Sequence, residues 1–304
     1  MSIVERNFTS FDGKNLKYCQ WIKKKSIGTI IIFHGMAEHS RRYDNFAMFL
    51  NNKGYDVFAL DFRGHGKSIE LLPGYFADKE GWQIVVNDIK LFIDHVFDKS
   101  ISKNIVLLGH SMGSLLLRSY LIKFYDQRIE KVVLSGTPAA PSVAMLKLAQ
   151  IITEIIIFLG GGEKPSALLD GLVFGKYSSS IKNPLTPFDW LTYDKEIVKE
   201  YIVDPYCGFV CTGSFFRDLF KGISYCNETE NILRIDSTKK ILILTGDEDP
   251  VGDFGKASIL LQERLNNVLR KGNVILKVYK GYRHETLNEI GKTQVYEDIT
   301  EFIR

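Results

Sequence analysis

Residues 104–117 read NIVLLGHSMGSLLL, in which an apolar run leads into Gly109-His110-Ser111-Met112-Gly113 and a second apolar run follows. An uninterrupted apolar run of this kind is typical of a buried strand, and the longer stretch after it has the character of a helix. A strand, a Gly-x-Ser-x-Gly turn and a helix together hold a serine hydroxyl above the end of a sheet. This context predicts Ser111 as a nucleophile and makes an ordinary glycine-rich turn the weaker interpretation.

The same turn indicates where negative charge would be stabilised. The backbone N–H of Met112 falls at a helix N-terminus, where the N–H groups lack helical partners. His34-Gly35-Met36 directly follows an apolar strand at 29–33, and the loop after that strand supplies the second donor in folds with this motif. The N–H groups of Met36 and Met112 are therefore the candidates for an oxyanion hole. We expect His34 to hold this loop by a side-chain hydrogen bond.

A serine nucleophile needs a base, and the position of the histidines selects one. In folds with this motif the order along the chain is serine, then acid, then histidine. Of the six histidines, only His284 follows Ser111. It comes shortly after a predicted strand at 274–279, where a loop can return a side chain over the end of the sheet. His284 is therefore the predicted base.

The acid that would orient His284 is expected at the end of another strand. The apolar run at 240–244 is followed by Thr245 and Gly-Asp-Glu-Asp-Pro at 246–250. Ligand-binding and catalytic groups gather at the carboxyl ends of strands in open α/β sheets. Order and position suit Asp247, Glu248 and Asp249, and spacing alone does not decide between Asp247 and Asp249.

Apolar runs without polar alternation follow one another along the chain, separated by helical patterns. Such runs are typical of a parallel sheet covered on both faces, so we predict an α/β fold. The first twenty residues have a period of two and predict a leading antiparallel hairpin. The other predicted strands are 29–33, 56–60, 104–108, 131–134, 240–244 and 274–279, and the predicted helices outside the region described next are 43–52, 81–97, 112–125, 255–269 and 294–303.

This alternation stops between residues 137 and 236, where prolines, a triple glycine and helical patterns occur without a convincing strand. We therefore predict a core formed by 1–136 and 237–304, with a helical insertion at 137–236. Within it, residues 142–159 are apolar except for a polar sector that includes Lys147, Gln150 and Glu154. This pattern predicts an amphipathic helix rather than a membrane span. Its apolar face could pack on the core, line an apolar site or rest on a membrane surface, and core packing is the commonest of these.

Composition narrows the functional class. The 304 residues are 45% apolar and 25% charged with a net charge of +3, which is ordinary for a globular protein and predicts no nucleic-acid partner. Phosphate-binding, dinucleotide-binding and zinc motifs are absent from the sequence, so we expect no cofactor and no metal. Four cysteines, among them Cys207 and Cys211, favour free thiols in a reducing compartment. The first residues lack a signal-peptide pattern, and we expect a cytoplasmic protein.

Taken together, the motifs resemble the α/β-hydrolase superfamily, and within it the group of monoacylglycerol lipases, lysophospholipases and serine aminopeptidases S33. The resemblance implies an eight-stranded, mostly parallel sheet with a helical lid between the sixth and seventh strands, matching 137–236. It also implies Asp249 as the acid of the triad, with the N–H groups of Met36 and Met112 as the oxyanion hole. The segments that carry it are 34–40, 61–68, 109–113, 246–250 and 281–285.

The resemblance implies a serine hydrolase that cleaves carboxylic esters through an acyl-enzyme. The apolar segment 142–159 favours a medium- or long-chain monoacylglycerol or lysophospholipid as the small-molecule substrate, with peripheral membrane contact through the same segment. Hydrolysis of a small ester, an amide or a thioester by the same triad is the alternative. A non-catalytic binding protein is disfavoured because Ser111, Asp249 and His284 are all present. The sequence does not indicate the oligomeric state.

Overall fold

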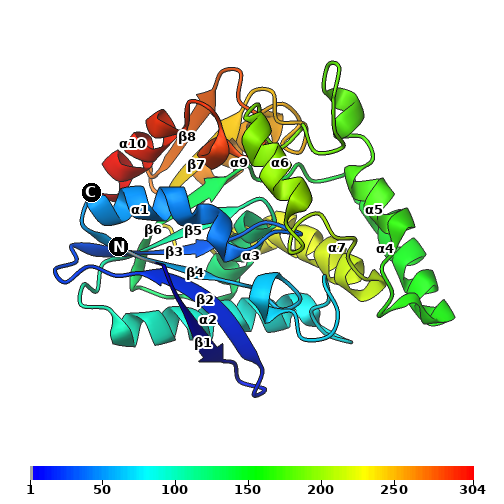
Figure 1. The fold of residues 1–304 in the computed structure, drawn as a ribbon, viewed down its shortest axis with the longest axis horizontal. Coiled ribbons are helices and arrows are strands. Elements are labelled where there is room, and N and C mark those ends of the chain that lie inside the picture. The colour runs from blue at the N-terminus through cyan, green and yellow to red at the C-terminus, as the bar shows by residue number, and fades with distance from the viewer. Residues whose placement is uncertain (1–2) are drawn as a thin grey trace.

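The structure is a computed structural model that describes residues 3–304. Its centre is one eight-stranded sheet with the strand order β1-β2-β4-β3-β5-β6-β7-β8 (Figure 1). The leading hairpin pairs antiparallel and joins β4 antiparallel, whereas the remaining neighbours are parallel. The predicted α/β fold with a mostly parallel sheet is thereby confirmed. The strands are β1 Val4–Thr9, β2 Asn15–Trp21, β3 Gly28–Phe33, β4 Tyr55–Leu60, β5 Ile105–His110, β6 Ile129–Ser135, β7 Lys240–Gly246 and β8 Val274–Tyr279.

Helices cover both faces of the sheet, as the uninterrupted apolar strands require. Side chains of α1 and α10 form a hydrophobic core on one face, and those of α2, α3 and α9 contribute to a larger core on the other. Some helix ends differ by two or three residues from the predictions, because turn residues beyond a helix do not fix its last turn. These helices are α1 Asp44–Asn52, α2 Gly81–Lys99, α3 Met112–Lys123, α9 Lys256–Asn266 and α10 Lys292–Ile303.

The chain between β6 and β7 is predominantly helical. Its helix α7 is buried along most of its length and belongs to the larger core, where it packs against α2 and α3. Helices α4 and α5 lie farther out, with α7 between them and the sheet (Figure 1). The α-helices of this segment are α4 Val143–Ile156, α5 Ala167–Phe174, α6 Lys195–Val203, α7 Gly213–Asn227 and α8 Thr229–Ile232.

The face of helix α4 that contains Gln150 and Thr153 packs inward, whereas its aliphatic face is exposed. Thr153 is fully buried, and the Gln150 side-chain amide donates hydrogen bonds to the Phe220 carbonyl and the Ser224 hydroxyl of α7. The sequence favoured packing of the apolar face against the core. For most of this face that prediction is wrong. Residues of α4 and the turn after it that expose more than half of their side chains are Val143, Met145, Leu148, Ile151, Ile155, Phe158 and Leu159.

This helix continues through a short π-helical turn, Ile157–Gly161, in which Gly160 has a φ of +83°. Among residues 3–304, Val143–Gly161 is the one helix that is long and apolar enough to cross a membrane by length and composition. In the fold described here, however, its polar residue Gln150 is hydrogen-bonded to α7 and Thr153 is buried. The amphipathic pattern predicted for this segment is therefore present, with its polar side partly inside.

Gly113, the second residue of α3, permits the close contact between this helix and β3. A Cβ at this position would lie 2.1 Å from the Phe33 carbonyl oxygen, whereas a Cβ at Gly171 in α5 would have nothing within 4 Å. We expect Gly113→Ala to lower the free energy of unfolding by about 3 kcal/mol, because the clash is with backbone. Gly171→Ala should be neutral or stabilise by up to about 1 kcal/mol. Urea unfolding of both variants tests this, and equal effects would contradict it.

Candidate active site

Ser111 occupies the sharp turn between β5 and α3. Its backbone has a φ of +50° and a ψ of −118°, a conformation that non-glycine residues rarely adopt. The Ser111 N–H donates to the Ser135 carbonyl at 2.9 Å, which anchors the turn to the neighbouring strand β6. A Cβ at Gly109 would lie 2.5 Å from the Gly113 carbonyl oxygen, so the turn leaves no room for one there. Ser111 is half-buried and lines a cavity.

His284 and Asp249 form a buried pair on the loops that follow β8 and β7. The Nδ1–H of His284 donates to Oδ2 of Asp249 at 3.0 Å. Burial disfavours the charged imidazole, but the charge of Asp249 and this hydrogen bond outweigh burial and raise the pKa of His284 above its ordinary value. The second oxygen of Asp249 accepts the Val251 N–H at 2.9 Å. The carboxylate is thus fixed in place and able to orient the imidazole.

The two other carboxylates of the segment that follows β7 have different partners. Asp247 accepts the Gly281 N–H at 2.6 Å, and Glu248 accepts the Tyr193 hydroxyl at 2.6 Å. The structure therefore brings Asp249, and not Asp247, to His284. Spacing in the sequence could not make this choice, because it depends on how the loop after β7 turns.

The loop after β3 lies next to the serine turn. The Gly35 N–H donates to the Glu38 carboxylate at 2.5 Å, and among residues 3–304 the Met36 N–H has no acceptor. As the first residue of α3, Met112 has no acceptor within its helix. His34 fixes the loop, because its Nδ1 contacts the Gly35 carbonyl at 2.7 Å and its Nε2 accepts the Phe62 N–H at 3.1 Å. Burial lowers the pKa of His34 well below its ordinary value, so the ring is neutral.

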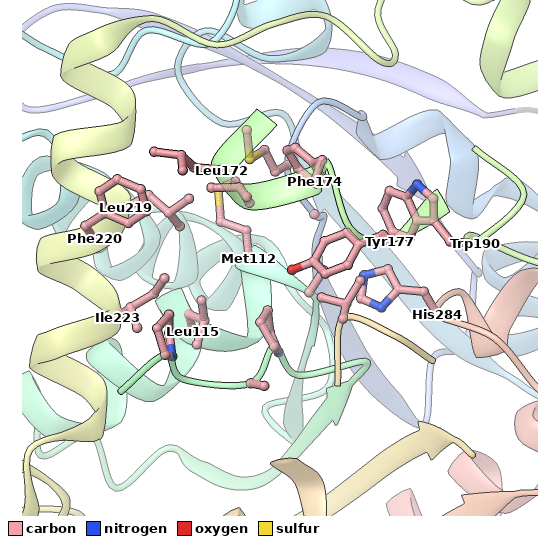
Figure 2. A pocket seen from close by; sticks show the side chains of 18 of the residues that line it. Met112, Leu115, Leu172, Phe174, Tyr177, Trp190, Leu219, Phe220, Ile223 and His284 are labelled. Carbon is pink, nitrogen blue, oxygen red and sulfur yellow. The ribbon is translucent and has the colours of Figure 1, made fainter. Parts of the chain in front are cut away.

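One cavity of about 280 Å³ connects these groups (Figure 2). At one end it is lined by His284, Ser111 and the loop after β3. The other end is formed by side chains of α3, α4 and α7, and nearly all of them are apolar. In Figure 2, Met112 lies between the two ends. Figure 2 shows Leu115, Leu219, Phe220 and Ile223 at the far end, and Leu146 and Ile152 of α4 also line the cavity.

A buried ion-pair network beside the cavity was not anticipated. Arg42 donates two hydrogen bonds to Glu285, at 2.6 and 2.7 Å, and one to Glu38 at 2.7 Å. Burial alone would raise the pKa of either carboxyl group, but the charge of Arg42 outweighs it and holds both pKa values below their ordinary range. Arg42 also lies over the Tyr201 ring at 4.8 Å, and the Tyr201 hydroxyl donates to the Ala37 carbonyl.

This network joins three separate parts of the chain. Glu38 holds the loop after β3, Glu285 is the neighbour of His284, and Tyr201 belongs to α6. The sequence contained a signal for it, since Glu38 and Arg42 are spaced four apart beside the His-Gly-Met segment. The third partner is 243 positions away from Arg42 along the chain, and only the fold could identify it.

One group of side chains has donor atoms suited to a metal ion. The ligand atoms of His39, Asp204 and Cys207 lie within 4.8 Å of one another. His39 Nε2 contacts Asp204 Oδ2 at 2.9 Å, and the other Asp204 oxygen accepts the Tyr206 N–H at 2.8 Å. Burial raises the pKa of the Cys207 thiol, which disfavours the thiolate that a metal requires. His39 and Asp204 are therefore paired with each other, and Cys207 is kept as a neutral thiol beside them. All four cysteines are free, as predicted.

Comparisons with known proteins give a matching family and several similar proteins. The family model described as "Serine aminopeptidase, S33" matches residues 24–291. A monoacylglycerol lipase of Mycolicibacterium smegmatis is 25% identical over 300 residues, covering 98% of this chain and 96% of the relative. A monoglyceride lipase of Mus musculus is 27% identical over 295 residues, covering 92% of this chain and 82% of the relative.

Solved structures have the same fold. A thermostable carboxyl esterase from Bacillus coagulans superposes with a TM-score of 0.90 at 27% identity, covering 100% of this chain and 98% of the other. A soluble variant of the Saccharomyces cerevisiae monoglyceride lipase superposes with a TM-score of 0.76, covering 100% and 94%. Its identity is 21%, so this second likeness concerns the fold alone.

Removing Arg42 should destabilise the protein through the charges that it leaves behind. Arg42→Met leaves Glu38 and Glu285 buried without a counter-charge, and we expect a loss of about 3–5 kcal/mol in the free energy of unfolding. The neighbouring Arg41 is half-exposed and pairs with Glu5 at the surface, so Arg41→Met should cost less than about 1 kcal/mol. Guanidinium unfolding of the two variants measures the difference. A loss of unfolding free energy for Arg42→Met no larger than that for Arg41→Met would contradict this prediction.

Proposed function

The chain belongs to the serine aminopeptidase S33 family of α/β hydrolases, and from this premise we propose that it hydrolyses monoacylglycerols with medium or long acyl chains. The observation that carries the proposal is the buried His284–Asp249 pair at the Ser111 end of a cavity whose other end is apolar. Relatives that align over almost the whole chain are named for the hydrolysis of monoacylglycerols.

In the first half of the proposed reaction, Ser111 Oγ attacks the ester carbonyl carbon. His284 takes the hydroxyl proton on Nε2, because its Nδ1–H is held by Asp249. The N–H groups of Met36 and Met112 stabilise the oxyanion that forms, since both residues line the cavity beside Ser111. When the tetrahedral intermediate collapses, His284 gives its proton to the leaving alcohol oxygen. The products of this half are the free alcohol and an acyl-Ser111 ester.

In the second half, water replaces the alcohol. His284 removes a proton from the water as it attacks the acyl-Ser111 carbonyl, and the same N–H groups stabilise the second oxyanion. Collapse of that intermediate returns the proton to Ser111 Oγ and releases the fatty acid. Because Asp249 is fully buried and fixed by Val251, it orients the imidazole and stabilises its charged form in both halves.

The proposed substrate orientation follows from this chemistry. His284 has to reach the leaving oxygen, so the alcohol part lies at the His284 end of the cavity. The acyl chain then extends past Met112 toward the apolar side chains of α3, α4 and α7. Burial of each methylene group there contributes about 0.8 kcal/mol, which favours long chains over acetate.

Amide cleavage at a free amino terminus, which the family description suggests, finds less support. A substrate ammonium group requires carboxylates that lack another counter-charge. Glu38 and Glu285 do line the cavity, but both carboxylates bind the Arg42 guanidinium, at 2.7 and 2.6 Å, so an ammonium group there would lie beside that cation. The ester is therefore the favoured substrate class.

Hydrolysis measured against acyl length tests the proposal. We expect kcat/KM to rise from acetyl to decanoyl glycerol by roughly fourfold for each methylene group that enters the apolar end. The Ser111→Ala variant should be inactive at every length. A Ser111-dependent maximum at acetate would refute the long-chain substrate, and activity that survives Ser111→Ala would refute the mechanism.

The segment 137–236 is proposed to act as a lid that touches the membrane on which such substrates reside. The support is the exposed aliphatic face of α4 and its π-helical extension, where Phe158 is 89% and Leu159 75% exposed. Such a face binds a lipid surface in proportion to the apolar area that it inserts. We propose a cytoplasmic protein that makes reversible peripheral contact through this face, and its four unpaired cysteines fit a reducing compartment.

Sedimentation with phosphatidylcholine vesicles tests the contact. We expect Phe158→Glu to weaken vesicle binding by roughly tenfold or more, because it replaces an inserted aromatic ring by a charge. Leu71→Glu is the matched control, since Leu71 is 90% exposed but lies outside the proposed lid. Equal binding of the wild type and Phe158→Glu would contradict the proposal, as would an equal loss for both variants.

A further inference from the structure

Tyr177 places a hydroxyl group in the cavity wall that no protein group engages. Tyr177 follows α5, and its side chain lines the cavity near His284. Figure 2 shows the hydroxyl pointing away from Trp190, toward Met112. Within residues 3–304 this hydroxyl has no hydrogen-bond partner, although its backbone N–H donates to the Phe174 carbonyl at 2.9 Å. The hydroxyl opens into the cavity, where it is free to pair with a bound molecule.

The ring that carries this hydroxyl is held firmly. It packs against Phe174 with a centroid distance of 5.8 Å and against Trp190 with one of 5.3 Å. Trp190 in turn packs on the imidazole of His284 at 5.4 Å. The Trp190 carbonyl accepts the His284 N–H at 3.4 Å, and the next carbonyl, of Leu191, accepts the Glu285 N–H at 2.7 Å. The position of Tyr177 is therefore fixed relative to the proposed base.

The hydroxyl can act as a hydrogen-bond donor under all ordinary conditions. Burial, helped by the charge of Asp249, raises the pKa of Tyr177 above its usual value, so the phenol keeps its proton. The nearby carboxylates of Glu38 and Glu285 are already engaged by Arg42. A phenylalanine would present the same ring without a polar atom, so the hydroxyl is the part of Tyr177 that can recognise a polar group.

We propose that the Tyr177 hydroxyl donates a hydrogen bond to a free hydroxyl of the alcohol part of the substrate, which makes Tyr177 a specificity residue for polyol esters. The proposal rests on the proposed function, because that chemistry places the alcohol at the His284 end, where Tyr177 lies. A glycerol monoester retains two free hydroxyl groups beside the scissile bond. A simple alkyl ester of the same acid has none and cannot make this contact.

The experiment compares the wild type and Tyr177→Phe on 1-decanoylglycerol and methyl decanoate. Both esters give the same acyl-enzyme, so a difference between them in kcat/KM reports on the alcohol part during acylation. We expect Tyr177→Phe to lower kcat/KM for the glycerol ester about 3- to 10-fold, as for one neutral hydrogen bond, and to change that for the methyl ester less than about twofold. Tyr125→Phe, at an exposed tyrosine outside the cavity, should change neither.

Thermal unfolding of the same variants separates a binding role from a structural one. Because the hydroxyl has no protein partner, we expect Tyr177→Phe to unfold at the wild-type temperature or slightly above it. Equal losses on both esters, no loss on either, or a clearly lowered unfolding temperature would each overturn the proposal for Tyr177. If the wild type cleaves neither ester, the proposed function itself is refuted and this proposal falls with it.

Discussion

The site depends on one steric constraint, which is the close contact of α3 with the end of β3. Gly113 lies so near the Phe33 carbonyl that a Cβ would overlap it, and Gly109 is similarly close to Gly113. Between them Ser111 is forced to a φ of +50°, which lifts its side chain out of the sheet. The same contact brings the N-terminus of α3 beside the loop after β3, so one steric constraint positions both the proposed nucleophile and the proposed N–H donors. The steric strain at Ser111 is sustained by the surrounding parallel strands, which form the best-buried part of the molecule.

Features that depend on residues close together in the chain could be predicted from the sequence. The sheet, its leading hairpin and the turn around Ser111 follow from apolar periodicity and glycine placement, and His284 follows from its position after Ser111. Asp249 could be separated from Asp247 only by family resemblance, because the path of the loop decides which carboxylate meets His284. Arg42, Tyr177 and Trp190 escaped prediction since their roles arise from contacts between distant segments. No periodic pattern records such contacts.

Helix α4 shows a different limit of sequence patterns. Amphipathicity identifies two faces but does not say which one the protein covers, because an apolar face is satisfied equally by a core or by lipid. Here Gln150 finds hydrogen-bond acceptors on α7 and Thr153 is buried, so the mixed face turns inward and the aliphatic face outward. The inner surface still contributes Leu146 and Ile152 to the cavity. One helix thus borders both the apolar end of the cavity and the exterior.

The segment between β6 and β7 is attached to the core very unevenly. Around Trp190 its carbonyl groups bind the backbone of the His284 loop, and Arg283 donates to the Asp189 carbonyl at 2.6 Å. Helix α4, in contrast, rests chiefly on α7. The segment is therefore firmly attached beside His284 and Asp249, the proposed proton-transfer groups, and is attached less directly to the sheet at α4. In the proposed reaction, an outward movement of α4 would open the apolar end of the cavity and let the fatty acid leave, while His284 and Asp249 keep their contact.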